Sequence, residues 1–259
     1  YAPPAGPGKD PASIDAELVK YRDANKIPKG EVIQAYGYDE NVMPNGRPLN
    51  RDDLDKALPD NPVLVGHVSM HGAVLNSAAM KKWGLSASTR TPPGGVIVRK
   101  PGTQEPYGLI METAYLPIFA SLPQPTREQE VAWSKAGQML YAQHGVTTAH
   151  EAATHLSDLE VMKRAADGGA TLIDVIAYPF ITDLEKVLAK YPKETWGKYE
   201  NRLKIGGVKI TIDGSPQGKT AFFTTPYLTG GPGGEKKWSG ELTFPEEVIT
   251  KAVKVVYDM

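Results

Sequence analysis

The sequence predicts an α/β fold that contains units of an incomplete (β/α)8 barrel, and three observations lead to this expectation. From residue 126 onward, short apolar segments alternate with capped helical patterns, as in a parallel sheet covered by helices. Segment 203–213 alternates apolar and polar residues, which suits a barrel strand with a polar inner face. The chain ends on the apolar helical segment 248–259, after which another strand would normally follow. A small open α/β sheet is the alternative.

Composition excludes several classes of protein. The chain has 259 residues, which suits one large domain or two small ones. Its 29 Lys and Arg balance 30 Asp and Glu without a basic segment, so we expect no nucleic-acid partner. There is no cysteine, which rules out disulfides and thiolate metal sites. The stretch 61–80 lacks charge but contains His, Asn and Ser, so we expect no membrane span and a soluble protein, cytoplasmic or exported to the periplasm.

Residues 1–125 predict an irregular α+β region. A helix should start with Asp10 as N-cap and Pro11 in the first turn, and end near Asn25. The remaining expected elements here are a strand at 31–38, a short helix between Asn50 and Leu58, a buried strand at 63–68, a helix between Asn76 and Trp83, and a loop or hairpin around 96–100.

Residues 126–259 predict regular βα units. Thr126 and Gln129 form a capping box for a helix that ends at His144. The elements expected after it are strands near 146–150, 172–178 and 203–213, a helix capped by Ser157 with Glu160, a helix at 183–191, and a last helix capped by Thr243 with Glu246.

Lys209 is the most informative residue of the predicted strand 203–213. Period-two alternation places Lys209, Thr211 and Asp213 on one face of that strand. At the mouth of a barrel, a lysine amine can form a Schiff base, or a carbamate whose two oxygens bridge two divalent metals. The alternative is that Lys209 is a solvent-exposed lysine on an edge strand. The residues from Asp213 to Ser215 are equally typical of a turn.

Other polar residues are weaker candidates for a site. His67 and His71 are four residues apart, a metal-like spacing that loop or packing histidines also show. His150 and Glu151 lie at the end of the predicted strand 146–150, at the edge where barrel enzymes place their chemistry. Glu112 is expected either to line a pocket or to be exposed to solvent. Other residues have structural explanations: N-capping accounts for Asn76 with Ser77, and the dipole of its helix for His144.

Taken together and in order, these segments resemble the amidohydrolase superfamily, specifically the family 3 (YtcJ-like) metal-dependent hydrolases. The matching pieces are His71 with Asn76 and Ser77, the stretch 108–112, the stretch 145–151, and Lys209 to Ser215 continuing to Thr220 and Ala221. The likeness extends over nearly the whole chain from about residue 30.

The resemblance implies a fold, a reaction and a set of residues. It implies a (β/α)8 barrel of the metal-dependent hydrolase type with a small β-sandwich, in which residues 1–125 are an insertion after the first strand. It implies one or two divalent metals, commonly zinc, and hydrolysis of C–N bonds other than peptide bonds in a small molecule of the amide or amidine type by metal-activated hydroxide. By resemblance, Lys209 is the metal-bridging carbamate. The implied pocket residues are His71, Asn76, Glu112, His150, Glu151, Asp213 and Ser215.

The chain departs from the family pattern in several places. Ser69 and Met70 precede His71 where the family often has Asp-Gly, Glu151 replaces an Asp, and Lys219 replaces an Arg. The family's His-x-His, two later histidines and a late Asp have no match in these 259 residues. We therefore expect an incomplete metal site without an assignable catalytic base, the remaining barrel strands and the sandwich being absent.

Two other functions stay open at this stage. Lys209 would serve a barrel lyase as a Schiff-base nucleophile. A barrel without catalysis would bind a ligand and leave it unchanged. For every reading we expect a small-molecule partner, with self-association or association with the missing part of the same protein as further possibilities.

Overall fold

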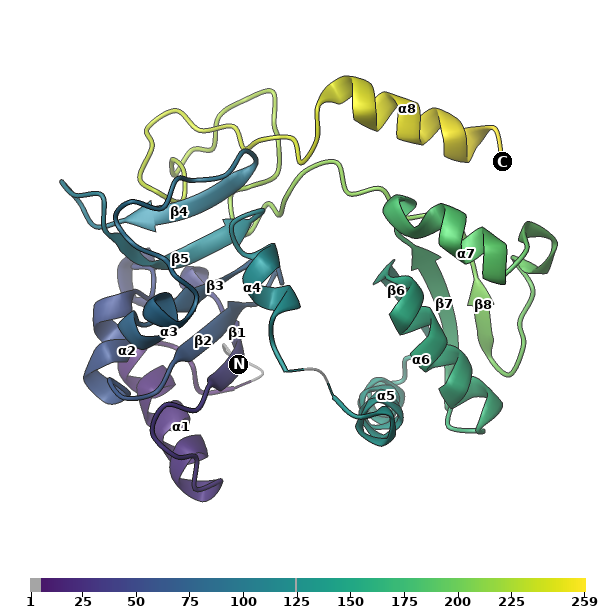
Figure 1. Cartoon of the computed structure of the whole chain (residues 1–259), viewed down its shortest axis with the longest axis horizontal. Coiled ribbons are helices and arrows are strands. Elements are labelled where there is room, and N and C mark those ends of the chain that lie inside the picture. Colours follow the sequence, from purple (N-terminus) through teal and green to yellow (C-terminus); the bar gives the residue numbers. More distant parts are fainter. Residues whose placement is uncertain (1–5, 124) are drawn as a thin grey trace. The chain divides into compact units, whose positions relative to one another are not determined.

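The structure is a computed structural model that describes residues 6–123 and 125–259. The chain forms two compact units (Figure 1). We call unit 1 the described residues up to Leu122 together with Asp213–Phe244, and unit 2 Pro123–Ile212 together with Pro245–Met259. Each unit has its own sheet and is described by itself.

Unit 1 is built on a five-stranded mixed sheet with the order β1-β2-β3-β5-β4. Only the β1–β2 pair is parallel, and the other pairs are antiparallel. The strands are β1 (Ile33–Tyr38), β2 (Val63–His67), β3 (Gly72–Leu75), β4 (Gly95–Arg99) and β5 (Pro106–Glu112). Strand β2 is buried along its whole length, as its continuous apolar sequence predicts. The expected strands at 31–38 and 63–68 and the hairpin around 96–100 are thus confirmed.

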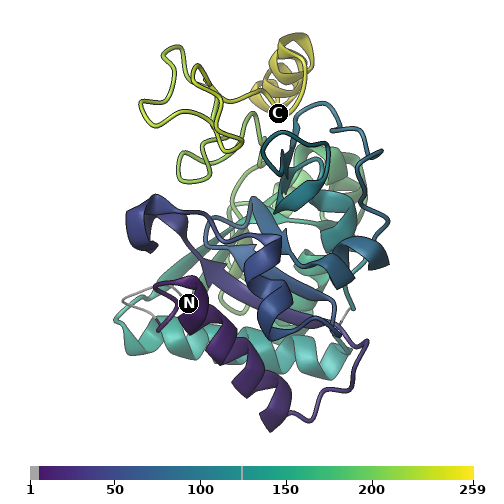
Figure 2. The same ribbon diagram turned by 90° about the vertical axis from the view of Figure 1, so that its left-hand side faces the viewer.

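Helices cover both faces of this sheet. Helices α1 (Pro11–Ala24) and α2 (Arg51–Ala57) lie over one face (Figure 2). Their Leu18 and Leu54 belong to the core on that face. Helices α3 (Ser77–Lys82) and α4 (Leu116–Ala120) pack Met80 and Ile118 against the other. The N-caps predicted at Asp10, Asn50 and Asn76 all accept a hydrogen bond from a backbone N–H of the first turn. Short 3₁₀ turns occur at Glu40–Val42 and Pro44–Gly46.

Unit 2 contains a three-stranded parallel sheet with the order β6-β7-β8. Strand β7 (Asp174–Pro179) alternates buried and half-buried residues. Its buried Val175 and Ala177 pack with Leu159 of α6 and Val187 of α7. The unit's other elements are α5 (Arg127–Gln143), β6 (Thr148–Thr154), α6 (Leu156–Asp167), α7 (Leu184–Lys190), β8 (Leu203–Ile205), α8 (Glu246–Tyr257) and two 3₁₀ turns, Ile181–Asp183 and Lys193–Thr195.

Three predicted boundaries in unit 2 are wrong. Strand β6 begins and ends later than 146–150, so His150 and Glu151 lie within it rather than at its end. Helix α6 starts at Leu156, because Asp158 accepts from the N–H of His155 and Asp183 from that of Leu156. Helix α8 has Pro245, not Thr243, as its N-cap residue. The start of α6 is thus set by the carboxylates of Asp158 and Asp183, and the start of α8 follows Pro245.

The predicted long strand 203–213 is also wrong. Strand β8 ends at Ile205. The N–H of Gly206 still donates to the Ala177 carbonyl of β7, and Lys209 then forms an isolated bridge with Phe180, directly after β7. At Gly206 and Gly207 the main chain lies close to side chains of the neighbouring strand β7. A Cβ atom on Gly206 would collide with the side chain of Ile176, and one on Gly207 would lie 2.9 Å from the Tyr178 ring. The expected alternation is lost as well, because Ile212 is 44% exposed.

The observed fold is therefore mixed α/β with open sheets. In the described residues the strands form the two sheets above, neither of which closes on itself. Within the same residues, no helix combines the length and apolar character needed to cross a membrane.

Candidate functional site

His71 and Glu112, two of the residues expected in a pocket, lie side by side in unit 1. His71 precedes β3 and Glu112 ends β5, and these strands are neighbours in the sheet. The His71 Nδ1 atom lies 3.0 and 3.1 Å from the two carboxylate oxygens of Glu112. Because a carboxylate only accepts, Nδ1 carries a proton, and in the neutral imidazole Nε2 is then the acceptor. Glu112 has φ +52°, a strained value for a non-glycine residue.

The predicted segment from Asp213 to Ser215 lies beside this pair. A Cβ atom on Gly214 would collide with the Glu112 carboxylate and with the Thr220 hydroxyl, so only glycine allows this approach. The buried Ser215 donates its N–H to Thr220 Oγ1 over 2.9 Å. Val68, Ser69, His71 and the segment 214–217 line a cavity of about 380 Å³. Residues far apart in sequence thus form one polar cavity.

Asp213 closes the loop that follows rather than facing this cavity. Its Oδ2 accepts from the N–H of Phe222 over 2.9 Å. The nearby Tyr227 hydroxyl donates to the Ala221 carbonyl. Burial raises the pKa of Tyr227, and the charge of Asp213 adds to the shift.

Asn76 has a structural role. It is fully buried, and its Oδ1 accepts from the N–H groups of Val63 and Ala79 over 2.9 Å each. Its Nδ2 donates to the carbonyls of Leu58 and Asn61. These four bonds use both lone pairs and both hydrogens of the side-chain amide, which leaves nothing for a ligand. N-capping, the plainer explanation from sequence, accounts for this residue.

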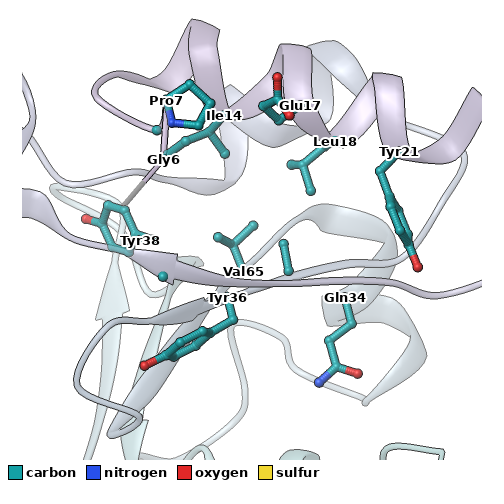
Figure 3. Close-up of a pocket in the computed structure, with 13 residues that line it drawn as sticks. Gly6, Pro7, Ile14, Glu17, Leu18, Tyr21, Gln34, Tyr36, Tyr38 and Val65 are labelled. Atoms are coloured by element: carbon teal, nitrogen blue, oxygen red, sulfur yellow. The ribbon is translucent and has the colours of Figure 1, made fainter. Parts of the chain in front are cut away.

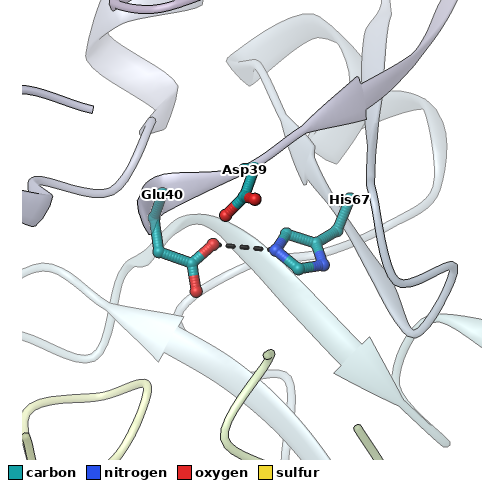
Figure 4. Close-up of side chains that lie close together, drawn as sticks. All are labelled: Asp39, Glu40 and His67. Carbon is teal, nitrogen blue, oxygen red and sulfur yellow. Dashed lines mark hydrogen bonds and ion pairs between the residues drawn. The ribbon is translucent and has the colours of Figure 1, made fainter. Parts of the chain in front are cut away.

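A second polar group, formed by Asp39, Glu40 and His67, lies at the end of β1 and β2 (Figure 4). One ligand-type atom from each residue lies within 4.8 Å of the others. His67 is 1% exposed, and its Nε2 lies 2.8 Å from Glu40 Oε2. Burial and the charge of Glu40 raise the pKa of the neighbouring Tyr38 well above its usual value.

Asp39 and Glu40 were not among the residues predicted from the sequence for a site. Strands β1 and β2 are parallel, so their carboxyl ends meet at one edge of the sheet. Asp39 and Glu40 directly follow β1, and His67 ends β2. This placement after two neighbouring strands is the signal that could have indicated the group.

Donor chemistry tests whether a metal fits the Asp39–Glu40–His67 group. The N–H of Ser69 donates to His67 Nδ1 over 3.1 Å, so Nδ1 accepts and Nε2 carries the ring proton. A metal-binding nitrogen must be unprotonated, yet Nε2 uses its proton toward Glu40. Asp39 Oδ1 is taken by the backbone and side-chain N–H groups of Asn41. As arranged, the group does not fit a metal.

Lys209, in unit 2, fits a metal-binding role in part. Its backbone N–H donates to the Pro179 carbonyl over 2.7 Å, and its carbonyl accepts from Ile181 over 2.9 Å. These bonds fix the main chain beside the end of β7. The side chain is half-buried, and no hydrogen bond or ion pair of its amine occurs among residues 6–123 and 125–259. The amine is therefore available for a carbamate, but one such ligand is not a complete metal site.

His150 and Glu151, also in unit 2, line a cavity of about 260 Å³ together with residues of α5 and α6. The His150 ring packs against Tyr178 with centroids 5.2 Å apart. Glu151 Oε1 accepts from the N–H of Ala153 over 2.8 Å. His150 and Glu151 thus lie beside a cavity, and one carboxylate oxygen of Glu151 is bonded to the backbone of its own strand.

The cavity between α1 and β1 has another character (Figure 3). It measures about 380 Å³ and is lined by Ile14, Leu18, Tyr36 and Tyr38 among others, with Glu17 as its ionisable carboxylate. An apolar groove with a single carboxylate lacks the grouped donors and acceptors of a catalytic site. The polar cavity beside His71 is the stronger candidate in unit 1.

Comparison with known proteins decides the family. Residues 5–259 match the amidohydrolase family. The chain belongs to this family. This amidohydrolase chain is 29% identical over 242 residues to YtcJ of Bacillus subtilis, whose name describes it as an amidohydrolase, covering 86% of the chain and 44% of YtcJ. It is 27% identical over 165 residues to the N-substituted formamide deformylase of Arthrobacter pascens, covering 61% of the chain and 30% of that enzyme.

Solved structures show the same fold. The amidohydrolase chain resembles an uncharacterised metal-dependent hydrolase from Pyrococcus horikoshii with a TM-score of 0.58 and 22% identity, over 96% of the chain and 46% of that structure. A hydrolase from Pyrococcus furiosus, also described as metal-dependent, gives 0.55 and 23%, over 96% and 47%. The chain thus spans less than half the length of these relatives and has the fold of part of them. The expected family, YtcJ-like amidohydrolases, is confirmed.

Proposed function

We propose that the whole protein hydrolyses C–N bonds other than peptide bonds, in a small molecule of the amide or formamide type. The observation that carries this proposal is the family match over residues 5–259. The relative named an N-substituted formamide deformylase supports the substrate class. Units of a partial (β/α)8 barrel remain our proposal for unit 2, in line with its parallel βα order.

Lys209 is the residue of this chain proposed to hold a divalent metal, with zinc as the candidate ion. Reaction of its amine with CO₂ gives a carbamate with two oxygen ligands, and the half-buried amine has no competing partner among the described residues. When bound, the metal polarises a substrate carbonyl and activates water.

His71 and Glu112 are proposed to bind the substrate's polar end. Glu112 holds the His71 Nδ1–H, so the imidazole presents Nε2 as a hydrogen-bond acceptor. The N–H of an amide or formamide is the matching donor. Because Gly214 has no side chain, the loop can lie close to the Glu112 carboxylate.

Hydrolysis of N-substituted formamides and acetamides by the whole protein tests this function, with Glu112→Gln as the informative variant. Loss of the carboxylate charge weakens the hold on His71, so kcat/KM should fall about tenfold. Glu105→Gln is the matched control, because Glu105 is exposed and pairs with Arg51. Equal kcat/KM for Glu112→Gln and wild type would exclude the role of this pair. Borohydride trapping of a carbonyl compound on Lys209 would instead support a lyase.

A further inference from the structure

A continuous chain of hydrogen bonds joins Ser69, His67 and Glu40 in unit 1. The Ser69 Oγ lies 2.7 Å from His67 Nδ1, and His67 Nε2 lies 2.8 Å from Glu40 Oε2. A hydroxyl, an imidazole and a carboxylate in this order are the arrangement by which enzymes activate a serine.

The proton positions also suit activation. The Ser69 N–H can only donate, so His67 Nδ1 is an acceptor and the ring proton lies on Nε2, toward Glu40. The N–H of His71 donates to Ser69 Oγ over 3.3 Å. The Ser69 hydroxyl hydrogen is then directed at His67 Nδ1, which accepts from the hydroxyl and the N–H of Ser69 together and is the nitrogen able to take the proton.

His67 is more buried than Ser69. His67 is 1% exposed, and together with Glu40 it lines a second cavity of about 200 Å³. Ser69 is half-buried and lines the cavity of about 380 Å³ beside His71 and Gln217. Met70, the next residue, has φ +65°, so the turn that presents Ser69 is strained.

We propose that Ser69 is a nucleophile that reacts with activated esters and organophosphonates without a metal. Ser69 Oγ attacks the ester carbonyl and its proton passes to His67 Nδ1. The C–O bond to the leaving alcohol then breaks, and that alcohol takes the proton from His67. Water, deprotonated by His67, hydrolyses the acyl-Ser69 ester and restores the hydroxyl. Glu40 is a positioning residue that fixes the imidazole tautomer. This activity is separate from amide hydrolysis.

Labelling of the whole protein with a fluorophosphonate probe in the presence of a metal chelator tests this proposal. The phosphonate should bond to Ser69 Oγ with loss of fluoride, and peptide mass spectrometry should locate it there. Ser69→Ala should abolish labelling, whereas Ser88→Ala, at an exposed serine, should leave it unchanged.

Variants of Glu40 separate activation from simple structure. Glu40→Gln should slow labelling about 100-fold, the size of a general-base contribution. Glu40→Asp keeps the carboxylate and should recover part of that rate. Circular dichroism shows whether both variants are folded. No label on Ser69, or equal rates for a folded Glu40→Gln and wild type, would overturn the proposal. Because the chelator is present throughout, neither result depends on the metal-dependent function.

Discussion

Single residues decide where polar groups can meet a ligand. Asn76 is saturated by four backbone partners, whereas His71 keeps Nε2 open because Glu112 takes only Nδ1. Sequence spacing could identify both residues but not this difference. The pairing depends on the register of β3 and β5, which joins residues 41 positions apart. Strand order, not local pattern, therefore separates a binding group from a structural one.

Asp15 supplies a prediction at this scale. Burial raises its pKa from 3.8 to about 6, with Asp53 adding to the shift, and its buried Oδ1 has no partner among the described residues. Because the folded pKa lies above the unfolded one, the chain loses stability as pH rises from about 4 to about 6. Asp15→Asn should be more stable than wild type at pH 8 by about 1 kcal/mol, allowing for solvent screening of a half-buried group.

Urea unfolding at pH 4 and pH 8 measures this difference. At pH 4, where wild-type Asp15 is protonated in the folded chain, the two proteins should have similar midpoints. An equal advantage of Asp15→Asn at both pH values would show that charge is not the cause.

Elements differ in how far the sequence predicts them. Helices α1, α2, α3 and α5 follow from their capping residues, because capping is a local interaction within four residues. Strand β8 does not follow from its sequence. Its apolar alternation continues to residue 213, but Tyr178 and Ile176 of the neighbouring strand pack over Gly206 and Gly207. This close approach is a tertiary contact at the point where the strand ends, and no local pattern records it.

Gly206→Ala tests the close packing at the end of β8. The added methyl group would meet Ile176 and the Tyr178 ring, so the free energy of unfolding should fall by about 1–3 kcal/mol. Gly137→Ala is the control, since Gly137 lies in α5 with open space at its Cβ position. Alanine there should be neutral or stabilising by up to about 1 kcal/mol. Thermal unfolding followed by circular dichroism measures both, and an unchanged midpoint for Gly206→Ala would contradict the close-packing account.

At the scale of the whole molecule, the likeness to the family extends over nearly the whole chain, whereas the proposed metal site has one ligand in it. The chain matches the amidohydrolase family over 5–259 while spanning 44% of YtcJ. The ordered motifs predicted that family correctly from sequence. The metal site was less predictable, because ligands of such a site come from several strands and their meeting depends on the complete fold. Lys209 is the one proposed ligand that this chain supplies.

Zinc binding by the whole protein, measured by equilibrium dialysis with and without bicarbonate, tests the central proposal most directly. If Lys209 acts as a carbamate, bicarbonate should increase bound zinc in the wild type and in Lys204→Arg, a control for a lysine whose amine lies over the Tyr199 ring. Lys209→Arg should bind little zinc and show no response to bicarbonate. Wild-type zinc binding by Lys209→Arg, with or without bicarbonate, would contradict the account.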